Sequence, residues 1–395
     1  MPIVLLIYFF NSFLLPHGLL YSAILTPVFI YWIWKSNSLL YLILSAFVIV
    51  LFDIYHISNG ADLKSLTVSS TLFISAISFC IASWNWLRDH TDLKSLMSGL
   101  LKWNSIFVLL ALAAAPFAFG RALLWYEVPI SPGIASFPRL KLFTYEAAFY
   151  AFLFAPVFLY YFWRIILGIE RNWLMITMAI FLPLILSLSF GVTGALAVAL
   201  SIAALVFWTQ LRTLPSIKKT LLYGGTFSII FLCVLVLVYP ENPIFDRLTN
   251  VFQGTDTSAR GRLFESFMFA FDLANSKSIW LGVGLGQIKI LGHDLIINFY
   301  QYEGEFADIV RIPNAMGELL ATYGIVGVIY KLSLEIYLFF KHSLYTNYFN
   351  FSLFLFVFIY QFTGSYLVNT AELLLWTTAI FVRFPELNAS YFKSE

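Results

Sequence analysis

The stretch Gly191-Val-Thr-Gly-Ala-Leu-Ala-Val-Ala-Leu-Ser-Ile-Ala-Ala-Leu-Val-Phe-Trp208 contains no charged residue and is long enough to cross a lipid bilayer as a helix. Similar apolar runs follow one another along the whole chain of 395 residues. The composition agrees, because 61% of the residues are hydrophobic and only 11% are charged, whereas about a quarter are charged in soluble domains. The sequence therefore predicts an all-α polytopic membrane protein.

Breaking the apolar runs at charges and at Pro and Gly clusters predicts about twelve transmembrane helices, with eleven as the alternative because the first run is short. The expected helices span residues 2–15, 19–34, 39–52, 66–86, 103–120, 143–163, 173–189, 191–208, 220–239, 315–330 and onward, 349–362 and 365–382. Short loops rich in Lys and Arg mark the cytoplasmic side. Among their residues are Lys35, Arg88, Arg164, Arg212 and Lys341.

This topology divides the chain into three regions. Residues 1–239 form an N-terminal membrane region of about nine helices, with a small periplasmic loop at 121–142. Residues 240–313 form one large periplasmic loop with short amphipathic helices. Residues 314–395 form a C-terminal membrane region of about three helices. We expect the chemistry on the outer face, where the polar residues gather.

Charge and composition exclude several functions. The net charge of +2 is close to balance, so the chain lacks the basic surface that binding of nucleic acid requires. Cys80 and Cys233 both lie in apolar runs, where packing is the ordinary role of cysteine. The sequence contains no pair of histidines at a spacing typical of a zinc site, so we expect neither a metal nor a cofactor. Transporters often carry polar residues at the bilayer midplane, and here these residues lie in the outer loops instead.

The large loop contains two arginines beside a glycine, in Thr255-Asp-Thr-Ser-Ala-Arg260-Gly-Arg262-Leu-Phe-Glu. The planar guanidinium group matches phosphate with two hydrogen bonds and stays charged at physiological pH. Arg260 and Arg262 are therefore candidates for binding the phosphate of an anionic lipid. The alternative is that they only contact the headgroups of the bilayer.

A glycine-rich segment follows, Trp280-Leu-Gly282-Val-Gly284-Leu-Gly286, which superficially resembles a dinucleotide-binding motif. The GxGxxG spacing is absent, so we interpret the segment as tight backbone turns. Next comes His293, in a polar tract. A histidine can act as a general base near neutral pH, and the alternative is a solvated side chain without a role.

The end of the large loop and the small loop carry matching sets of polar residues. Arg311 and Asn314 precede a helix, and Glu318 lies on the same face because it is four residues beyond Asn314. The small loop supplies Arg139 and Glu146 before the next apolar run. Two loops thus bring arginines and carboxylates to one membrane face, although Arg139 and Glu146 could instead form a structural salt bridge.

At these residues the sequence resembles the bacterial O-antigen polymerase and ligase superfamily, and its polymerase (Wzy) branch more than its ligase (WaaL) branch. The resemblance lies in Arg260-Gly-Arg262 with the stretch after it, the Leu281–Gly286 turn, the helix start at Asn314–Gly327, the Arg139–Glu146 block and the Ser187–Gly194 turn. Ligases have a histidine directly before the asparagine, where this chain has Pro313, and an arginine in the serine turn that this chain lacks.

The resemblance implies a metal-independent, inverting glycosyltransferase at the periplasmic face of the bacterial inner membrane. It would join oligosaccharide repeat units linked to undecaprenyl pyrophosphate, in contact with membrane lipid and with a polysaccharide chain-length regulator as a partner. The alternatives are an O-antigen ligase that transfers glycan to lipid A core, and a flippase for lipid-linked oligosaccharide.

Roles for the candidate residues follow from the same resemblance. The pyrophosphate would be bound by Arg262, Arg260, Arg311 and Arg139. Glu146 is the first candidate for the general base and His293 the second. Asn314 and Glu318 would contact the glycan or support the site.

Overall fold

The computed structural model describes residues 7–15, 19–90, 92–127, 138–214, 243–300 and 310–390. This part is all-α apart from a two-stranded antiparallel sheet of β1 (Trp125–Tyr126) and β2 (Arg139–Leu140). Five helices are long and apolar enough to cross a membrane, namely α4 (Leu39–Ser58), α5 (Leu63–Asp89), α6 (Leu93–Ala114), α8 (Ala147–Ile166) and α18 (Ala315–Lys341). Shorter apolar helices are α9 (Trp173–Ser187), α10 (Phe190–Val206), α19 (Tyr348–Tyr360) and α20 (Thr370–Phe381). The fold is that of a multi-pass membrane protein, in which five of the described helices reach spanning length.

Several helix boundaries differ from the predicted ones. The run at 19–34 forms two helices, α2 (Tyr21–Ile24) and α3 (Thr26–Lys35). The run at 103–120 starts earlier, because Asp92 caps α6 by accepting a hydrogen bond from the N–H of Ser95 at 3.0 Å, and ends before α7 (Ala118–Leu124). The predicted helix at 220–239, residues 2–6 of the first run and Cys233 lie outside the described residues.

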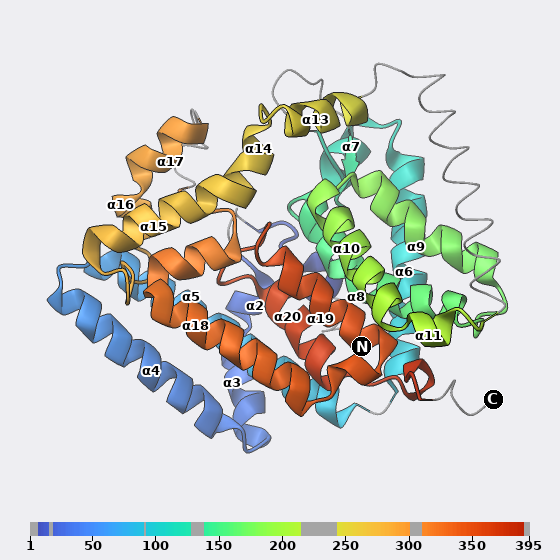
Figure 1. Cartoon of the computed structure of the whole chain (residues 1–395), viewed down its shortest axis with the longest axis horizontal. Helices are drawn as coiled ribbons and strands as arrows, with labels where there is room; N and C mark the ends of the chain where they lie inside the picture. Colours follow the sequence, from blue (N-terminus) through green and yellow to red (C-terminus); the bar gives the residue numbers. More distant parts are fainter. Residues whose placement is uncertain are drawn as a thin grey trace.

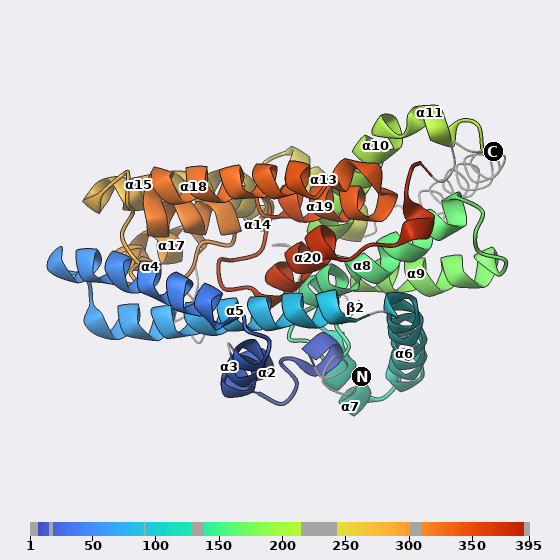
Figure 2. The same cartoon turned by 90° about the horizontal axis from the view of Figure 1, so that it is seen from below.

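Short helices occupy the region that was predicted as the large loop. They are α13 (Pro243–Phe252), α14 (Thr257–Arg260), the π-helical turn η1 (Gly261–Glu265), α15 (Ser266–Lys277), α16 (Ile288–Leu291) and α17 (His293–Tyr300). Figure 1 shows them in yellow to orange along one side of the molecule, and α15 packs along α18. The same neighbours lie side by side in Figure 2.

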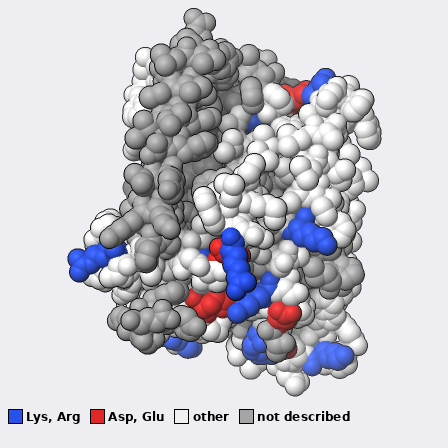
Figure 3. All heavy atoms as spheres, turned by 90° about the vertical axis from the view of Figure 1, so that its right-hand side faces the viewer, with Lys and Arg blue, Asp and Glu red and all other residues white. Residues whose placement is uncertain are grey.

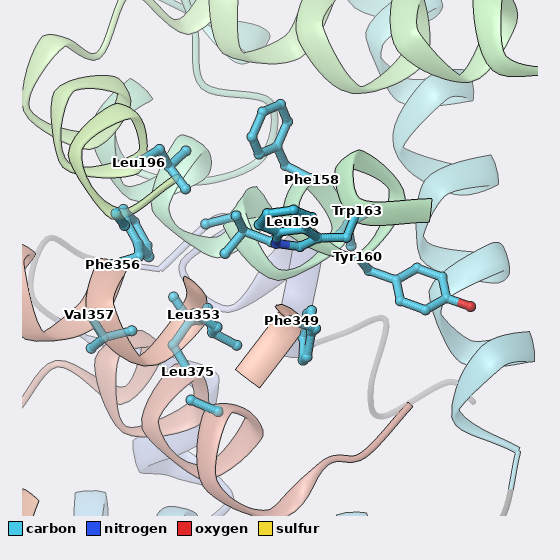
Figure 4. Packing of buried hydrophobic residues seen from close by; sticks show 14 of the residues in the cluster. Phe158, Leu159, Tyr160, Trp163, Leu196, Phe349, Leu353, Phe356, Val357 and Leu375 are labelled. Atoms are coloured by element: carbon cyan, nitrogen blue, oxygen red, sulfur yellow. The ribbon is translucent and has the colours of Figure 1, made fainter. Parts of the chain in front are cut away.

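Helix α8 lies at the centre of the main hydrophobic core and is buried along almost its whole length. Figure 4 shows Leu159 and Trp163 of α8 among the apolar side chains of α10, α19 and α20. The indole N–H of Trp163 donates to Ser352 Oγ at 2.9 Å, and Asn350 Nδ2 donates to the carbonyl oxygens of Ala379 at 2.7 Å and Val382 at 2.6 Å. These bonds connect α8, α19 and α20 into one packed unit beneath the loop helices.

Exposed apolar side chains cover much of the remaining surface, including those of Leu40, Phe47 and Leu109. A lipid environment accounts for such exposure, because a water-soluble protein rarely shows large contiguous apolar surfaces. Figure 3 shows that most Lys, Arg, Asp and Glu side chains on the visible face gather toward one end. Ion pairs contribute at the α8 C-terminus, where Arg164 pairs with Glu386 at 3.2 Å.

Helix α18 is broken at Gly324, whose φ of 65° and ψ of −164° are not helical. The glycine-rich segment fills the break. The N–H groups of Val283 and Gly284 donate to the carbonyls of Ala321 and Thr322 at 2.8 and 3.0 Å. The N–H groups of Ile325 and Val326 donate to the carbonyls of Ile279 and Trp280 at 3.0 and 3.1 Å. Gly282, Gly284 and Gly286 have positive φ, so the expected tight turns are confirmed, and their role is to close a discontinuous helix.

Replacing Gly324 with alanine should lower the thermal unfolding midpoint in detergent much more than replacing Gly60. Both glycines have positive φ (65° and 76°), which costs alanine about 1–2 kcal/mol, and the ψ of −164° places Gly324 in a region that is essentially restricted to glycine. A Cβ at Gly324 would lie 2.4 Å from the Trp280 carbonyl group, whereas Gly60 has nothing within 4 Å. We expect an additional loss of about 1–3 kcal/mol at Gly324, and equal midpoints for the two variants would contradict the close pairing.

Candidate functional site

The side chain of Asn314 joins three chain segments. It is fully buried, and its Oδ1 caps α18 by accepting from the N–H of Gly317 at 2.9 Å. Its Nδ2 donates to the carbonyl oxygen of Arg262 at 2.8 Å and to that of Phe362. The asparagine thereby holds the η1 turn and the loop between α19 and α20 at the start of α18. Both the oxygen and the nitrogen of its amide group are hydrogen-bonded to the backbone.

Arg311 lies at this junction, half-buried, with its guanidinium 4.8 Å from the ring centre of Tyr366. The hydroxyl groups of Tyr366 and Tyr145 are 3.2 Å apart. Burial disfavours the charged guanidinium, but the surrounding tyrosines and carboxylates outweigh this effect, so the pKa of Arg311 lies above its ordinary value. The carboxylates that interact with it are those of Glu146 and Glu318. Arg311 therefore keeps its charge in a confined site.

The two carboxylates near Arg311 differ in their contacts. Glu318 Oε2 accepts a hydrogen bond from the N–H of Leu367 at 2.6 Å. The side chain of Glu146 makes no hydrogen bond and no ion pair with any described residue. Its charge interacts electrostatically with Arg311, Tyr145 and Tyr366. Glu146 therefore remains available to accept a proton from a ligand.

Arg139 does not pair with Glu146, so the structural salt bridge considered for these two residues is absent. The residue belongs to β2, opposite Tyr126 of β1, and its guanidinium lies 5.0 Å from the centre of the Tyr126 ring. Its position is set by this small sheet, which packs against α8 and α9.

Arg262 reaches the same region from the η1 turn. Its Nη1 lies 3.9 Å from the position that a Cβ would take at Gly191, next to the ring of Tyr360. It makes no side-chain hydrogen bond or ion pair within the described part of the chain. Arg262 and the Ser187–Gly194 turn thus lie close together. The N–H groups of the Arg262 guanidinium are not bonded to any described residue.

Arg260 and His293 lie apart from this group. Arg260 is exposed, pairs with Glu265 at 2.7 Å and lies 5.8 Å from the centre of the Phe299 ring. His293 is exposed on α17, where its Nδ1 is 2.9 Å from Asp294 Oδ1. No interaction joins His293 to Arg262, Arg311 or either carboxylate of the site in the described residues.

Four helices begin around the arginines. Glu146 precedes α8, Gly191 lies in the first turn of α10, Asn314 caps α18, and Asn369 caps α20 just after Tyr366. Helix N-termini carry partial positive charge, so several of them together with arginines favour an anion. No described side chain caps α8 or α10, whereas the first N–H groups of α18 and α20 are bonded to Asn314, Asn369 and loop carbonyls. The arrangement can bind a phosphate or pyrophosphate group beside a free carboxylate.

Sequence reasoning missed several groups near this site. Tyr145, Tyr360 and Tyr366 carry no motif, and only their contacts reveal them. A buried charge network also lies below the site, in which Lys331 Nζ is 3.1 Å from Glu372 Oε1 and 3.8 Å from Glu335 Oε1. The i,i+4 spacing of a lysine and a glutamate inside an apolar helix could have signalled it.

No protein-family model matches the chain, and no curated protein is similar to it. In residues 7–15, 19–90, 92–127, 138–214, 243–300 and 310–390, no three His, Cys, Asp or Glu side chains form a group that could hold a metal ion.

Replacing Asn314 with alanine should destabilise the protein by roughly 3 kcal/mol, because it leaves three backbone groups, one buried and two partly buried, without their partner. Asn59 offers a matched control, since its exposed side chain bonds only within its own neighbourhood, to the Tyr55 carbonyl at 2.7 Å. Thermal unfolding of both alanine variants in detergent measures the difference. A small shift for Asn314→Ala, comparable with that for Asn59→Ala, would disprove the anchoring role.

Proposed function

We propose that this protein is a surface-polysaccharide polymerase, such as an O-antigen polymerase. It would be an inverting glycosyltransferase that joins oligosaccharide repeat units carried on undecaprenyl pyrophosphate at the periplasmic face of the bacterial inner membrane. The supporting observation is that Arg262, Arg311 and Glu146 lie around Tyr360 and Tyr366, near the N-termini of α8, α10, α18 and α20, and that Glu146 makes no hydrogen bond or ion pair with any described residue. The proposal includes about twelve membrane spans, with the short helices of residues 240–313 on the outer side.

The reaction needs two kinds of group, and the site contains both. The hydroxyl oxygen of the acceptor sugar attacks the anomeric carbon of the donor, and the bond from that carbon to the pyrophosphate oxygen breaks. Negative charge grows on the departing pyrophosphate, and preorganised guanidinium groups of Arg262 and Arg311 stabilise it strongly in a site with little water. The hydroxyl proton passes to the carboxylate of Glu146. Attack from the face opposite the leaving group inverts the anomeric centre.

Two other functions receive less support. A flippase should carry charged groups along a cavity, but the Lys331, Glu335 and Glu372 network lines neither the cavity between α8, α9 and α10 nor the one between α3, α5, α6 and α20. A ligase would be expected to have a histidine before Asn314, where Pro313 stands. The polymerase is therefore the function we propose, with a chain-length regulator as its expected partner.

Arg262→Ala should abolish long polysaccharide chains, because removing one such donor typically lowers the rate about 10²–10³-fold. The test is the lipopolysaccharide ladder of cells deleted for the gene and rescued with each variant at equal membrane level. Arg121→Ala is the control and should restore the ladder, since Arg121 is partly exposed, pairs with Glu127 at 3.2 Å and donates to the Ala115 carbonyl at 3.1 Å, with no contact to the candidate site among the described residues. We expect a weaker effect for Arg260→Ala than for Arg262→Ala.

The deletion strain itself separates the functions. Core lipid with a single repeat unit is the expected phenotype of a lost polymerase. Bare core with polymer accumulating on its lipid carrier would instead identify a ligase. An unchanged ladder, with no other surface glycan shortened, would refute the proposal.

Glu146→Gln should keep substrate binding and lose turnover by about 10²–10⁴-fold, the usual contribution of a general base. Glutamine preserves the size of the side chain but cannot take up the proton. The measurement is polymer formation by the purified protein from lipid-linked repeat units extracted from the deletion strain. Turnover close to that of the wild type would exclude Glu146 as the base.

A further inference from the structure

A polar network connects α18, α19 and α20, and its members are Lys331, Glu335, Gln361 and Glu372. Figures 1 and 2 show the three helices side by side. Lys331 Nζ lies 3.1 Å from Glu372 Oε1 and 3.8 Å from Glu335 Oε1. Gln361, at the C-terminus of α19, donates from Nε2 to Glu335 Oε2 at 3.0 Å. Two carboxyl groups from different helices therefore share one ammonium group.

This network contains more hydrogen-bond acceptors than donors. Three of its oxygen atoms are buried and have no hydrogen-bond partner among the described residues, namely Glu335 Oε1, Glu372 Oε2 and Gln361 Oε1. The three residues are exposed by only 6%, 5% and 0%. The nitrogen atoms of Lys331 and Gln361, in contrast, both have an acceptor. Buried acceptors without a partner cost free energy, so the missing component is a donor.

The charges of the network indicate the same missing component. With both carboxyl groups ionised, Glu335 and Glu372 carry two negative charges against the single positive charge of Lys331. The charged groups that act most on Glu335 are Lys331 of α18 and Glu372 of α20, while α19 contributes the neutral Gln361. An uncompensated charge is costly in an apolar interior, and carboxylates that share a site do not both stay ionised. A proton supplies the missing charge and the missing donor together.

The two carboxyl groups differ in how well their contacts stabilise a negative charge. Glu372 Oε1 accepts from Lys331 Nζ at 3.1 Å and from the indole N–H of Trp376 at 3.2 Å. Glu335 has one neutral donor, Gln361, within hydrogen-bond distance, and the ammonium of Lys331 lies 3.8 Å away. Negative charge is therefore favoured on Glu372, and the proton on Glu335.

We propose that this network is a proton-binding site within the membrane region, in which Glu335 carries a proton at neutral pH while Lys331 and Glu372 stay charged. The network is then electrically neutral. A metal cation fits less well, because it would lie beside the ammonium of Lys331. Glu372 also interacts electrostatically with Glu318 and Tyr360 of the candidate site, so loss of the proton changes the charge next to that site. This inference goes beyond the proposed polymerase function and does not depend on it.

Infrared difference spectra of the purified full chain in detergent test the proposal. Glu335→Gln should remove the C=O band of one protonated carboxyl group at neutral pH and leave the carboxylate bands unchanged. Glu127→Gln is the matched control, because Glu127 is exposed and pairs with Arg121 at 3.2 Å, and it should remove carboxylate bands instead. Loss of carboxylate bands from Glu335→Gln would overturn the assignment.

The wild type provides a second measurement that does not depend on the folding of a variant. As the pH is raised, its protonated carboxyl band should disappear and its thermal unfolding midpoint should fall, because a second negative charge is then buried. Glu335→Gln should keep its midpoint through the same pH range, since glutamine has no proton to lose. The same fall in both proteins, or a wild-type spectrum without the band at neutral pH, would refute the proposal.

Exchange of sodium chloride for choline chloride at constant pH separates the proton from a metal cation. The wild-type midpoint should be the same in both salts. A midpoint that sodium raises in the wild type but not in Glu335→Gln would identify a sodium site and overturn the proton assignment. Failure of the polymerase proposal would appear in the lipopolysaccharide ladder and would leave these spectra and midpoints unchanged.

Discussion

A helix surrounded by apolar groups must find partners for its terminal N–H and C=O groups within the protein. The part of α18 before the break at Gly324 has such partners at both of its ends. Asn314 and the loop after α19 satisfy the first three N–H groups, through the Asn314 side chain, the Gly364 carbonyl and the Gln361 carbonyl. The glycine-rich segment 279–284 satisfies the backbone around the break at Gly324. Much of the site's architecture follows from these bonds, because they hold the large loop against the membrane helices.

The same bonds decide which arginine faces the site. Asn314 holds the carbonyl of Arg262, so the side chain of that residue is directed to Gly191 and Tyr360. Arg260, on the last turn of α14, instead pairs with Glu265 at the surface. Arg262 belongs to the π-helical turn η1, which begins directly after Arg260, and such turns are frequent at functional sites. Two arginines separated by one glycine thus have different environments.

Several charged and polar side chains inside the membrane region contact one another and form a buried network. Lys331 lies between Glu335 and Glu372, and Gln361 donates to Glu335 at 3.0 Å. Removing Lys331 or Glu372 from this network leaves an uncompensated charge, so the network constrains the relative positions of α18, α19 and α20. Glu372 lies in the first turn of α20, close after the loop that holds Arg311 and Glu318. The network therefore supports the candidate site from below.

Local sequence determined the apolar helices, because the tendency of a long uncharged run to form a buried or lipid-facing helix depends on the run itself. Helices α4, α5, α8 and α10 accordingly lie close to the predicted runs. The sequence also predicts roles for Arg262, Arg311 and Glu146, since charged residues beside apolar runs are costly without a role. The break at Gly324, the tyrosines around Arg311 and the separation of Arg260 from Arg262 were decided only by the tertiary structure. Each of these depends on contacts between residues far apart in the chain, which no local pattern encodes.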